Sequence, residues 1–327
     1  MSTTKIKFID KDKSQFYQTV KKRVDQYFVD NSLSKHANGL MYLKSFFYIS
    51  IFIGSYLLIM LGNFPTSSML GLCIVHGMCA AFIGFNVCHD AIHGAYSSNG
   101  TVNKIFSYLF NIIGANAYVW SITHNVVHHT FTNIPGHDED IEVAPGLLRM
   151  SPTDEIKKIQ RYQHLYAFLL YSFASMSWVF RKDYKKFFQK RIGNYDNTKH
   201  PRFELFRLIF FKVVYYILFI IFPLVFLDIT WWQFIIGFVV MHMAEGLVLG
   251  LVFQLAHVVE GTDFPISDEQ GNIEEAWAVH QMQTTANFCR KSFWATWLCG
   301  GLNMQVEHHL FPKICHIHYP QIGRAHV

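Results

Sequence analysis

The chain has 327 residues, of which 51% are apolar and only 16% are charged, and its formal net charge is +5. Because an ordinary soluble domain carries about 25% charged residues, this composition argues against a soluble enzyme and favours a protein embedded in lipid. So modest a charge gives no reason to expect a nucleic-acid partner. The six cysteines show no CxxC spacing, so a disulfide framework is not expected.

The chain opens with a polar, lysine-rich arm, residues 1–40, which lacks the apolar core of a signal peptide and is predicted to be cytosolic. Four later segments offer about 20 apolar residues each, the length that crosses a bilayer. They are residues 41–61, 67–87, 205–227 and 232–256. They form two hairpins whose turns hold no lysine or arginine, so both turns are expected outside and both termini inside.

Two further apolar stretches, residues 102–120 and 162–180, are nearly long enough to cross a membrane but are interrupted by polar residues. If only one of them crossed, the histidine-rich segments before and after it would lie on opposite sides of the bilayer. Both are therefore predicted to be interfacial helices on the cytosolic face. The predicted fold is an all-α integral membrane protein with four spans, interfacial helices and a cytosolic histidine-rich cap, in one domain over residues 41–320.

Seven of the eighteen histidines fall into three tight clusters. The clusters are HDAIH at 89–93, HNVVHH at 124–129 and QVEHH at 305–309. On a helix, residues four apart share a face, with Cβ atoms about 5–6 Å apart, so two imidazoles can reach one metal ion. His257 adds an eighth candidate, because it follows the fourth predicted span as the first cluster follows the second. The spacing is that of metal ligands.

Other histidines are placed away from this site. His242 precedes His257 by about 22 Å of continuous helix and His76 precedes His89 by about 20 Å, so both are excluded. His242 and Glu245 lie deep in the fourth span, where they are interpreted either as a functional pair or as a polar contact between helices. Five more histidines are interpreted as ordinary hydrogen-bonded side chains: His137, His164, His280, His316 and His318.

Eight imidazoles are more than one metal ion needs. A zinc ion takes four ligands, and a catalytic zinc takes three from protein, so eight imply two ions or a mixture of sites. Imidazole suits iron, zinc, copper and nickel alike, so ligand type alone does not choose the metal.

The three clusters, in this order and with two predicted spans between the second and third, resemble the histidine boxes of the membrane fatty-acid desaturase superfamily. Gln305, in place of the first histidine of the third box, resembles the front-end branch, whose members insert a double bond between an existing one and the carboxyl end. The resemblance runs from about residue 41 to residue 320. It implies an O2-dependent fatty-acid desaturase with two iron ions. The implied ligands are His89, His93, His124, His128, His129, His257, His308 and His309.

Carboxylates and an amide stand beside these boxes. Metal-bound histidines usually donate their second N–H to a carboxylate or carbonyl, and Asp90 and Asp140 are candidates for this role. Capping or solvated carboxylates are an equal alternative for both, and Asp138 and Glu307 also lie beside the boxes without a predicted role. Gln305 is predicted to hydrogen-bond a metal-bound water or a group around the ligands.

Three alternatives remain open from the sequence. A hydroxylase or ketolase of the same superfamily differs only in whether oxygen is returned to carbon, and Gln305 followed by HHLFP favours the desaturase. A membrane metal transporter would place ligands near the bilayer midplane, where only His76, His242 and Glu245 lie. A bis-histidine haem protein would also need ligands inside facing helices.

The resemblance also implies partners. The substrate is a fatty acyl group carried on a lipid or on coenzyme A, in a bacterial inner membrane or the endoplasmic reticulum, with the active site on the cytosolic face. Many front-end relatives carry a fused cytochrome b5 domain with a His-Pro-Gly-Gly motif, which this sequence lacks. A separate cytochrome b5 or ferredoxin is therefore expected to supply the electrons.

The last residues have an unusual reading. IGRAHV at 322–327 is the translation of ATC GGA AGA GCA CAC GTC, which resembles a widely used sequencing adapter. Residues 321–327 are therefore interpreted as an artefact at a truncated C-terminus, in which His326 has no role. A natural short terminus is the alternative, and re-sequencing the source gene separates the two.

Overall fold

The computed structural model describes residues 5–141 and 143–323. Within them, four helices are long and apolar enough to cross a membrane. They are α2 (Gly39–Leu61), the helix Thr66–Ile92 that contains α3 (Thr66–Ile83) and α4 (His89–Ile92), the helix Glu204–Phe226 that contains α11 (Glu204–Tyr216) and α12 (Phe222–Phe226), and α13 (Trp231–His257). Each lies within a few residues of a predicted span, which confirms the four apolar helices.

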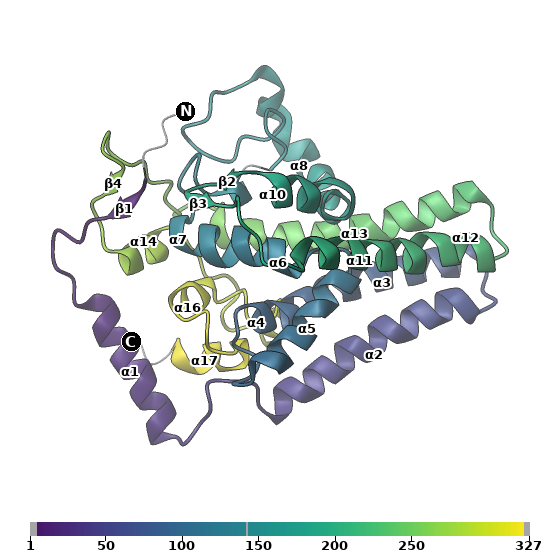
Figure 1. Ribbon diagram of the computed structural model, residues 1–327, viewed down its shortest axis with the longest axis horizontal. Helices are drawn as coiled ribbons and strands as arrows, with labels where there is room; N and C mark the ends of the chain where they lie inside the picture. Colours follow the sequence, from purple (N-terminus) through teal and green to yellow (C-terminus); the bar gives the residue numbers. More distant parts are fainter. Residues whose placement is uncertain (1–4, 142, 324–327) are drawn as a thin grey trace.

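The long helices run side by side, with the two short connections at one end and the histidine-bearing ends at the other (Figure 1). α3 packs against both α2 and α13. Its approach to α13 depends on Gly77, because a Cβ there would lie 2.0 Å from the carbonyl oxygen of Met241. Small residues at such crossings let helix backbones touch. Close contact of this kind holds helices together in a bilayer, where the hydrophobic effect does not drive their association.

The stretch 102–120 is not one helix, so the prediction of a single helix there is wrong, whereas its interfacial position stays a prediction. α5 (Gly100–Ile112) ends and a second helix runs over 117–131, bent by 107° from the first. Gly114 adopts a φ of +105°, which a residue with a side chain rarely adopts, and Asn116 caps the new helix by accepting a hydrogen bond from the Val119 N–H. The bend turns the second helix toward the first histidine cluster.

The stretch 162–180 forms α8 (Gln163–Ser172), α9 (Ala174–Ser177) and the start of a π-helical segment, Trp178–Lys182, which continues into α10 (Asp183–Phe188). α8 lies directly on α13, where a Cβ on Gly246 would lie 2.2 Å from the carbonyl oxygen of Ser172. Its outer face is apolar, with Leu165 72% exposed. An interfacial position for α8 stays a prediction that this exposed face favours.

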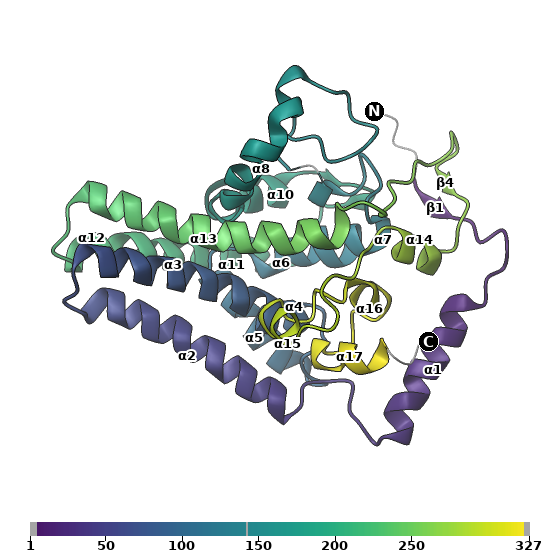
Figure 2. The ribbon, with the colours of Figure 1, turned by 180° about the vertical axis from the view of Figure 1, so that it is seen from behind.

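The remaining elements gather around the histidine-bearing ends of the long helices (Figures 1 and 2). They are α1 (Phe16–Asp30), α6 (Ala117–Trp120), α7 (His129–Phe131), α14 (Trp277–Gln283), α15 (Phe293–Leu298), α16 (Gln305–Leu310), α17 (Tyr319–Ile322) and two small strand pairs. β1 (Lys7–Phe8) pairs in parallel with β4 (Asn272–Ile273), and β2 (Arg191–Ile192) pairs antiparallel with β3 (Tyr195–Asp196). Buried Val24 and Phe28 of α1 pack against Ile314 and Ile322, which ties the N-terminal arm to this end.

Residues 324–327, which include His326, lie outside the described residues. The adapter interpretation of 321–327 therefore stays a prediction.

Candidate metal centre

The eight predicted ligands come from four elements and meet in one buried cluster. His89 and His93 stand at the end of the helix Thr66–Ile92, and His257 ends α13. The second box lies on the bent helix 117–131, and the third lies on α16. All eight side chains are buried: His89, His93, His124, His128, His129, His257, His308 and His309. The structure thus brings together every histidine that the sequence grouped.

A π-helical segment, Ser121–His128, shapes the second box. Its hydrogen bonds join residues five apart, whereas those of an α-helix join residues four apart. This wider turn brings His129 under His124, and their Nε2 atoms lie 3.2 Å apart. An α-helical reading accounts for His124 and His128 only, so the π-helical turn explains how the third histidine of this box can face the same site.

The ligand atoms fall into two groups, which suits two metal positions. Ring nitrogens of His89, His93, His124 and His308 lie within 4.8 Å of one another. Those of His128, His257 and His309 form a second group by the same measure. His129 groups with His308 and His309, one member of each set, so it lies between the two.

The chemistry of these nitrogens fits a metal. Among the eight clustered histidines, both ring nitrogens of His89 and one nitrogen on each of five others are buried without a hydrogen-bond partner in the described part of the chain: Nε2 of His93, His128, His308 and His309, and Nδ1 of His129. Buried polar atoms are rarely left unpaired in folded proteins. Burial, together with the neighbouring histidines, lowers the pKa of His308 and His309 well below the ordinary value. These rings are therefore neutral at pH 7 and offer lone pairs to a cation.

Outward hydrogen bonds fix which nitrogen faces the cluster. His128 Nδ1 lies 2.9 Å from Asp138 Oδ2, and His309 Nδ1 lies 2.7 Å from Gln281 Oε1. His308 Nδ1 lies 3.0 Å from the Tyr319 hydroxyl. An N–H at Nδ1 that donates outward leaves the lone pair of Nε2 pointing inward, and such partners set both tautomer and ring orientation.

Asp138, Gln281 and Tyr319 are residues of the site that the sequence analysis did not select. Asp138 lies beside the second box in the sequence, whereas nothing in sequence spacing singles out Gln281 or Tyr319. Asp138 is fully buried. Burial would raise its pKa, but the hydrogen bond to His128 and those from the backbone N–H groups of Asn133 and Asp140 hold the pKa of this carboxyl below its ordinary value, so it is an anion.

The three predicted helpers lie near the cluster in different ways. Gln305 donates from Nε2 to His257 Nε2 at 2.8 Å. Asp140 Oδ2 lies 3.9 Å from His124 Nδ1, beyond hydrogen-bond distance. Asp90 Oδ1 lies 3.9 Å from His89 Nδ1, whereas its other oxygen accepts hydrogen bonds from the His316 ring and backbone and from Cys315.

The histidines that the sequence analysis set aside do not join the two groups. His76 hydrogen-bonds Ser55, and His242 bonds Ser175 and Tyr215 inside the helix bundle. With Glu245 at 3.5 Å from His242, the deep polar pair makes contacts between helices. Outside both groups also lie His137, His164, His280, His316 and His318.

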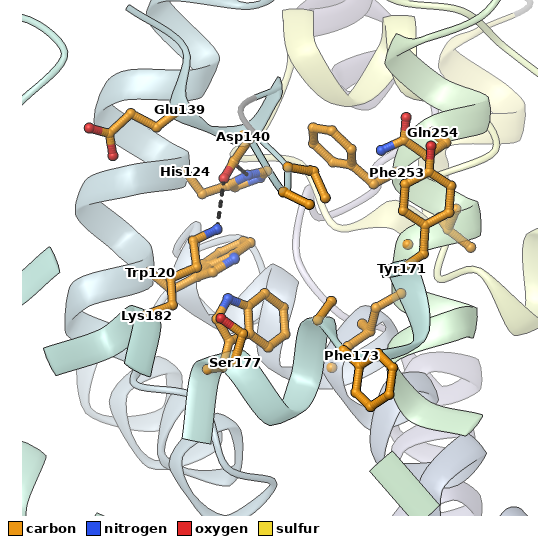
Figure 3. A pocket seen from close by; sticks show the side chains of 18 of the residues that line it. Trp120, His124, Glu139, Asp140, Tyr171, Phe173, Ser177, Lys182, Phe253 and Gln254 are labelled. Carbon is orange, nitrogen blue, oxygen red and sulfur yellow. Dashed lines mark hydrogen bonds and ion pairs between the residues drawn. The ribbon is translucent and has the colours of Figure 1, made fainter. Parts of the chain in front are cut away.

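A pocket of about 460 Å³ reaches the cluster from the side, a size typical of small-molecule sites. His89, His124 and Gln305 line it, and its wall also includes residues of α8, α9 and α13 and of the segment that follows Trp178. Figure 3 shows Lys182, Asp140 and Trp120 on one side of it and Tyr171, Phe173 and Phe253 on the other. One side therefore carries charged groups, whereas the other is uncharged and largely aromatic.

Replacing Asp138 with asparagine is expected to weaken metal binding about 10- to 100-fold, because the amide cannot supply the charge that orients His128. Metal affinity of the purified variant, measured by competition with a chelator, checks this. Asp154→Asn, in an exposed loop on the same half of the molecule, serves as the control. An affinity equal to that of the wild type would remove Asp138 from the site.

The comparisons with known proteins agree with this geometry. The model of the family described as fatty acid desaturase matches residues 65–327. An "sn-1 linoleoyl-lipid 6-desaturase" of Synechocystis sp. is 38% identical over 98% of this chain and 89% of its own length. A protein of the same name from Arthrospira platensis is 34% identical over 94% and 83%. An "Acyl-lipid (8-3)-desaturase" of Physcomitrium patens is 32% identical over 97% of this chain and 66% of its own length. With its three histidine boxes meeting at one buried centre, the chain belongs to the fatty acid desaturase family.

Proposed function

We propose that this desaturase acts on the acyl chains of membrane lipids, with front-end regioselectivity and a histidine-bound di-iron centre. The observation that carries the proposal is the cluster of eight buried histidines, six of which carry an unpartnered ring nitrogen, at the wall of a largely apolar pocket. The names of the relatives above favour acyl-lipid substrates and front-end positions, and Gln305 in the third box favours the same branch.

Two iron ions are the proposed occupants, one for each histidine group. When bound, they supply the activation of O2 that removes one hydrogen from each of two adjacent methylenes. Loss of these two hydrogens turns the saturated pair of carbons into an alkene. The two hydrogens, one O2, two electrons from a donor protein and two protons give two waters. The proposed ligands are His89, His93, His124, His128, His129, His257, His308 and His309.

The chain's own residues perform three tasks around this chemistry. The pocket walls hold the acyl chain beside the ligands and exclude water, which protects a strong oxidant from side reactions. Asp138, Gln281 and Tyr319 orient their histidines. Gln305, whose Oε1 is buried and unpartnered among the described residues, is placed to accept a hydrogen bond from a metal-bound water.

Asp90 and Asp140 are proposed to act at longer range. Each carboxylate stands 3.9 Å from the ring of a proposed ligand. It would stabilise the metal-bound imidazole through its negative charge rather than through a direct hydrogen bond. Asp90 also fixes His316, and through it the segment that follows the third box.

The alternatives fit less well. The relatives reported above are desaturases, which speaks against a hydroxylase or ketolase. A metal transporter needs ligands near the middle of its spans. Here the histidine groups lie at the ends of the helices, whereas the deep His242 bonds Ser175 and Tyr215 between helices and belongs to neither group. A haem site would share this difficulty.

The proposed orientation places the histidine end and both termini in the cytosol, where a separate cytochrome b5 or ferredoxin can dock. Reporter fusions after Lys190 and at the N-terminus are expected to report the cytosol, and fusions in residues 62–65 and 227–230 the opposite side. A fusion after Lys190 that reports the outside would show that the stretch before it crosses the membrane. Either a bacterial inner membrane or the endoplasmic reticulum satisfies this topology.

Product analysis tests the proposed function directly. The chain is expressed in a desaturase-deficient host and the fatty acids are profiled by mass spectrometry of derivatives that locate double bonds. The expected product carries a new double bond between an existing one and the carboxyl end. A double bond on the methyl side of all existing ones, or a hydroxylated chain without an alkene, would contradict the proposal.

A further inference from the structure

Four basic side chains are among those that line the pocket: Arg181, Lys182, Lys185 and Lys186. Lys182 differs from the others in its position. Its Nζ lies 3.2 Å from Asp140 Oδ1, and the other oxygen of Asp140 lies 3.9 Å from the His124 ring. One carboxylate thus separates this ammonium from a proposed metal ligand, as Figure 3 shows.

Lys182 keeps donors free for a ligand. An ammonium group has three N–H donors. Within residues 5–141 and 143–323, Asp140 is the hydrogen-bond partner of this ammonium, which also stands 5.9 Å from the centre of the Trp178 ring. Its side chain is 31% exposed. Lys186, in contrast, is ion-paired with Glu139 and nearly buried.

We propose that Lys182 binds an acceptor oxygen at the carboxyl end of the substrate and so fixes which carbons reach the metal centre. The inference rests on the proposed function and names the residue that sets its regioselectivity. A double bond between an existing one and the carboxyl end is close to the ester. The group that holds the ester must therefore stand close to the metal ligands, and Lys182 does so.

The opposite end of the pocket supports this direction of binding. On that side Figure 3 shows Phe173 and Phe253, which suit the hydrocarbon tail, together with Tyr171 and Gln254, which are polar but carry no charge. When the acyl chain is held at the charged end, the position of the new double bond is fixed relative to its carboxyl carbon. If the acyl chain were held at the opposite end, the position would be fixed relative to its methyl carbon, which gives the opposite regioselectivity.

The acceptor oxygen can belong to the acyl ester or to a headgroup phosphate. Vesicles of a neutral galactolipid and of phosphatidylglycerol, carrying the same acyl chains, separate these sources. An ester contact predicts the same effect of a Lys182 variant on both lipids. A phosphate contact predicts an effect on phosphatidylglycerol alone.

The test measures double-bond position and KM of the iron-loaded enzyme, together with binding of each lipid by the metal-free protein. Lys182→Met is expected to raise KM and the dissociation constant on the order of tenfold, because a charge-assisted hydrogen bond is lost. It should also spread the double bond over neighbouring positions. Lys182→Arg should restore a single position. Lys190→Met, which removes an exposed charge outside the pocket, should match the wild type.

Two results overturn the inference. One is Lys182→Met retaining a single position with unchanged KM. The other is Lys182→Met matching Asp140→Asn in lower kcat and lower iron content without altered position, because Lys182 would then only support Asp140. A wild-type enzyme that makes no alkene from either lipid would instead contradict the proposed function, so the two failures are distinguishable.

Discussion

Replacing His128 or His309 with alanine is expected to abolish desaturation and to strip metal from the protein. Each ring belongs to the second histidine group, and each is held by its own partner, Asp138 or Gln281. Loss of one ligand should reduce activity on the order of 10³-fold, or about 4 kcal/mol of transition-state stabilisation. Iron content should fall well below the about two ions that eight imidazoles imply.

Elemental analysis and turnover of the purified variants measure both effects. His164→Ala is the matched control, because His164 is an exposed histidine of α8 outside both groups. It should retain wild-type iron and activity. Full activity of either cluster variant, or zinc as the native ion, would contradict the proposed centre.

Filling the pocket is expected to stop catalysis while leaving the metal in place. Ser177 lines the pocket beside Trp178, and Figure 3 shows it facing the space between Lys182 and Phe173. A tryptophan there would occupy the volume that the acyl chain needs. We expect Ser177→Trp to lower kcat/KM on the order of 10²-fold or more, about 2.7 kcal/mol, with normal iron content.

Two variants control for the size of this change. Ser177→Ala keeps the pocket open and should retain activity. Leu169→Trp adds the same ring to the exposed face of α8, outside the pocket, and should be nearly silent. If Ser177→Trp remained active, the acyl chain would have to reach the ligands by another route.

The spans and the histidine cluster could be predicted from the sequence because both depend on local patterns. Four apolar runs of sufficient length specify four long helices. Histidines four apart specify shared helix faces, and the depth of His257 at the end of its span placed it with the boxes. The bent pair was misread, although Gly114 and Asn116 carry the usual signals of a break and a new helix start.

The surroundings of the ligands could not be predicted, because they arise from contacts between distant segments. Gln281 and Tyr319 reach His309 and His308 only after the chain after α13 folds back over the cluster. The charged end of the pocket likewise joins Lys182 to Asp140, 42 residues earlier. His129 comes to face His124 only through a π-helical turn, and no periodicity in the sequence predicts such a turn.

With the proposed iron ions as occupants, the inward-facing ring nitrogens would also link the abundance of this protein to the iron supply of its cell. Each buried nitrogen without a partner costs about 1–3 kcal/mol, and several such atoms lie together in the metal-free chain. A metal that binds only the folded state recovers this cost and stabilises the fold by mass action. Chains made under iron limitation would unfold more often and be degraded sooner, so scarcity would lower the number of enzyme molecules rather than the turnover of each.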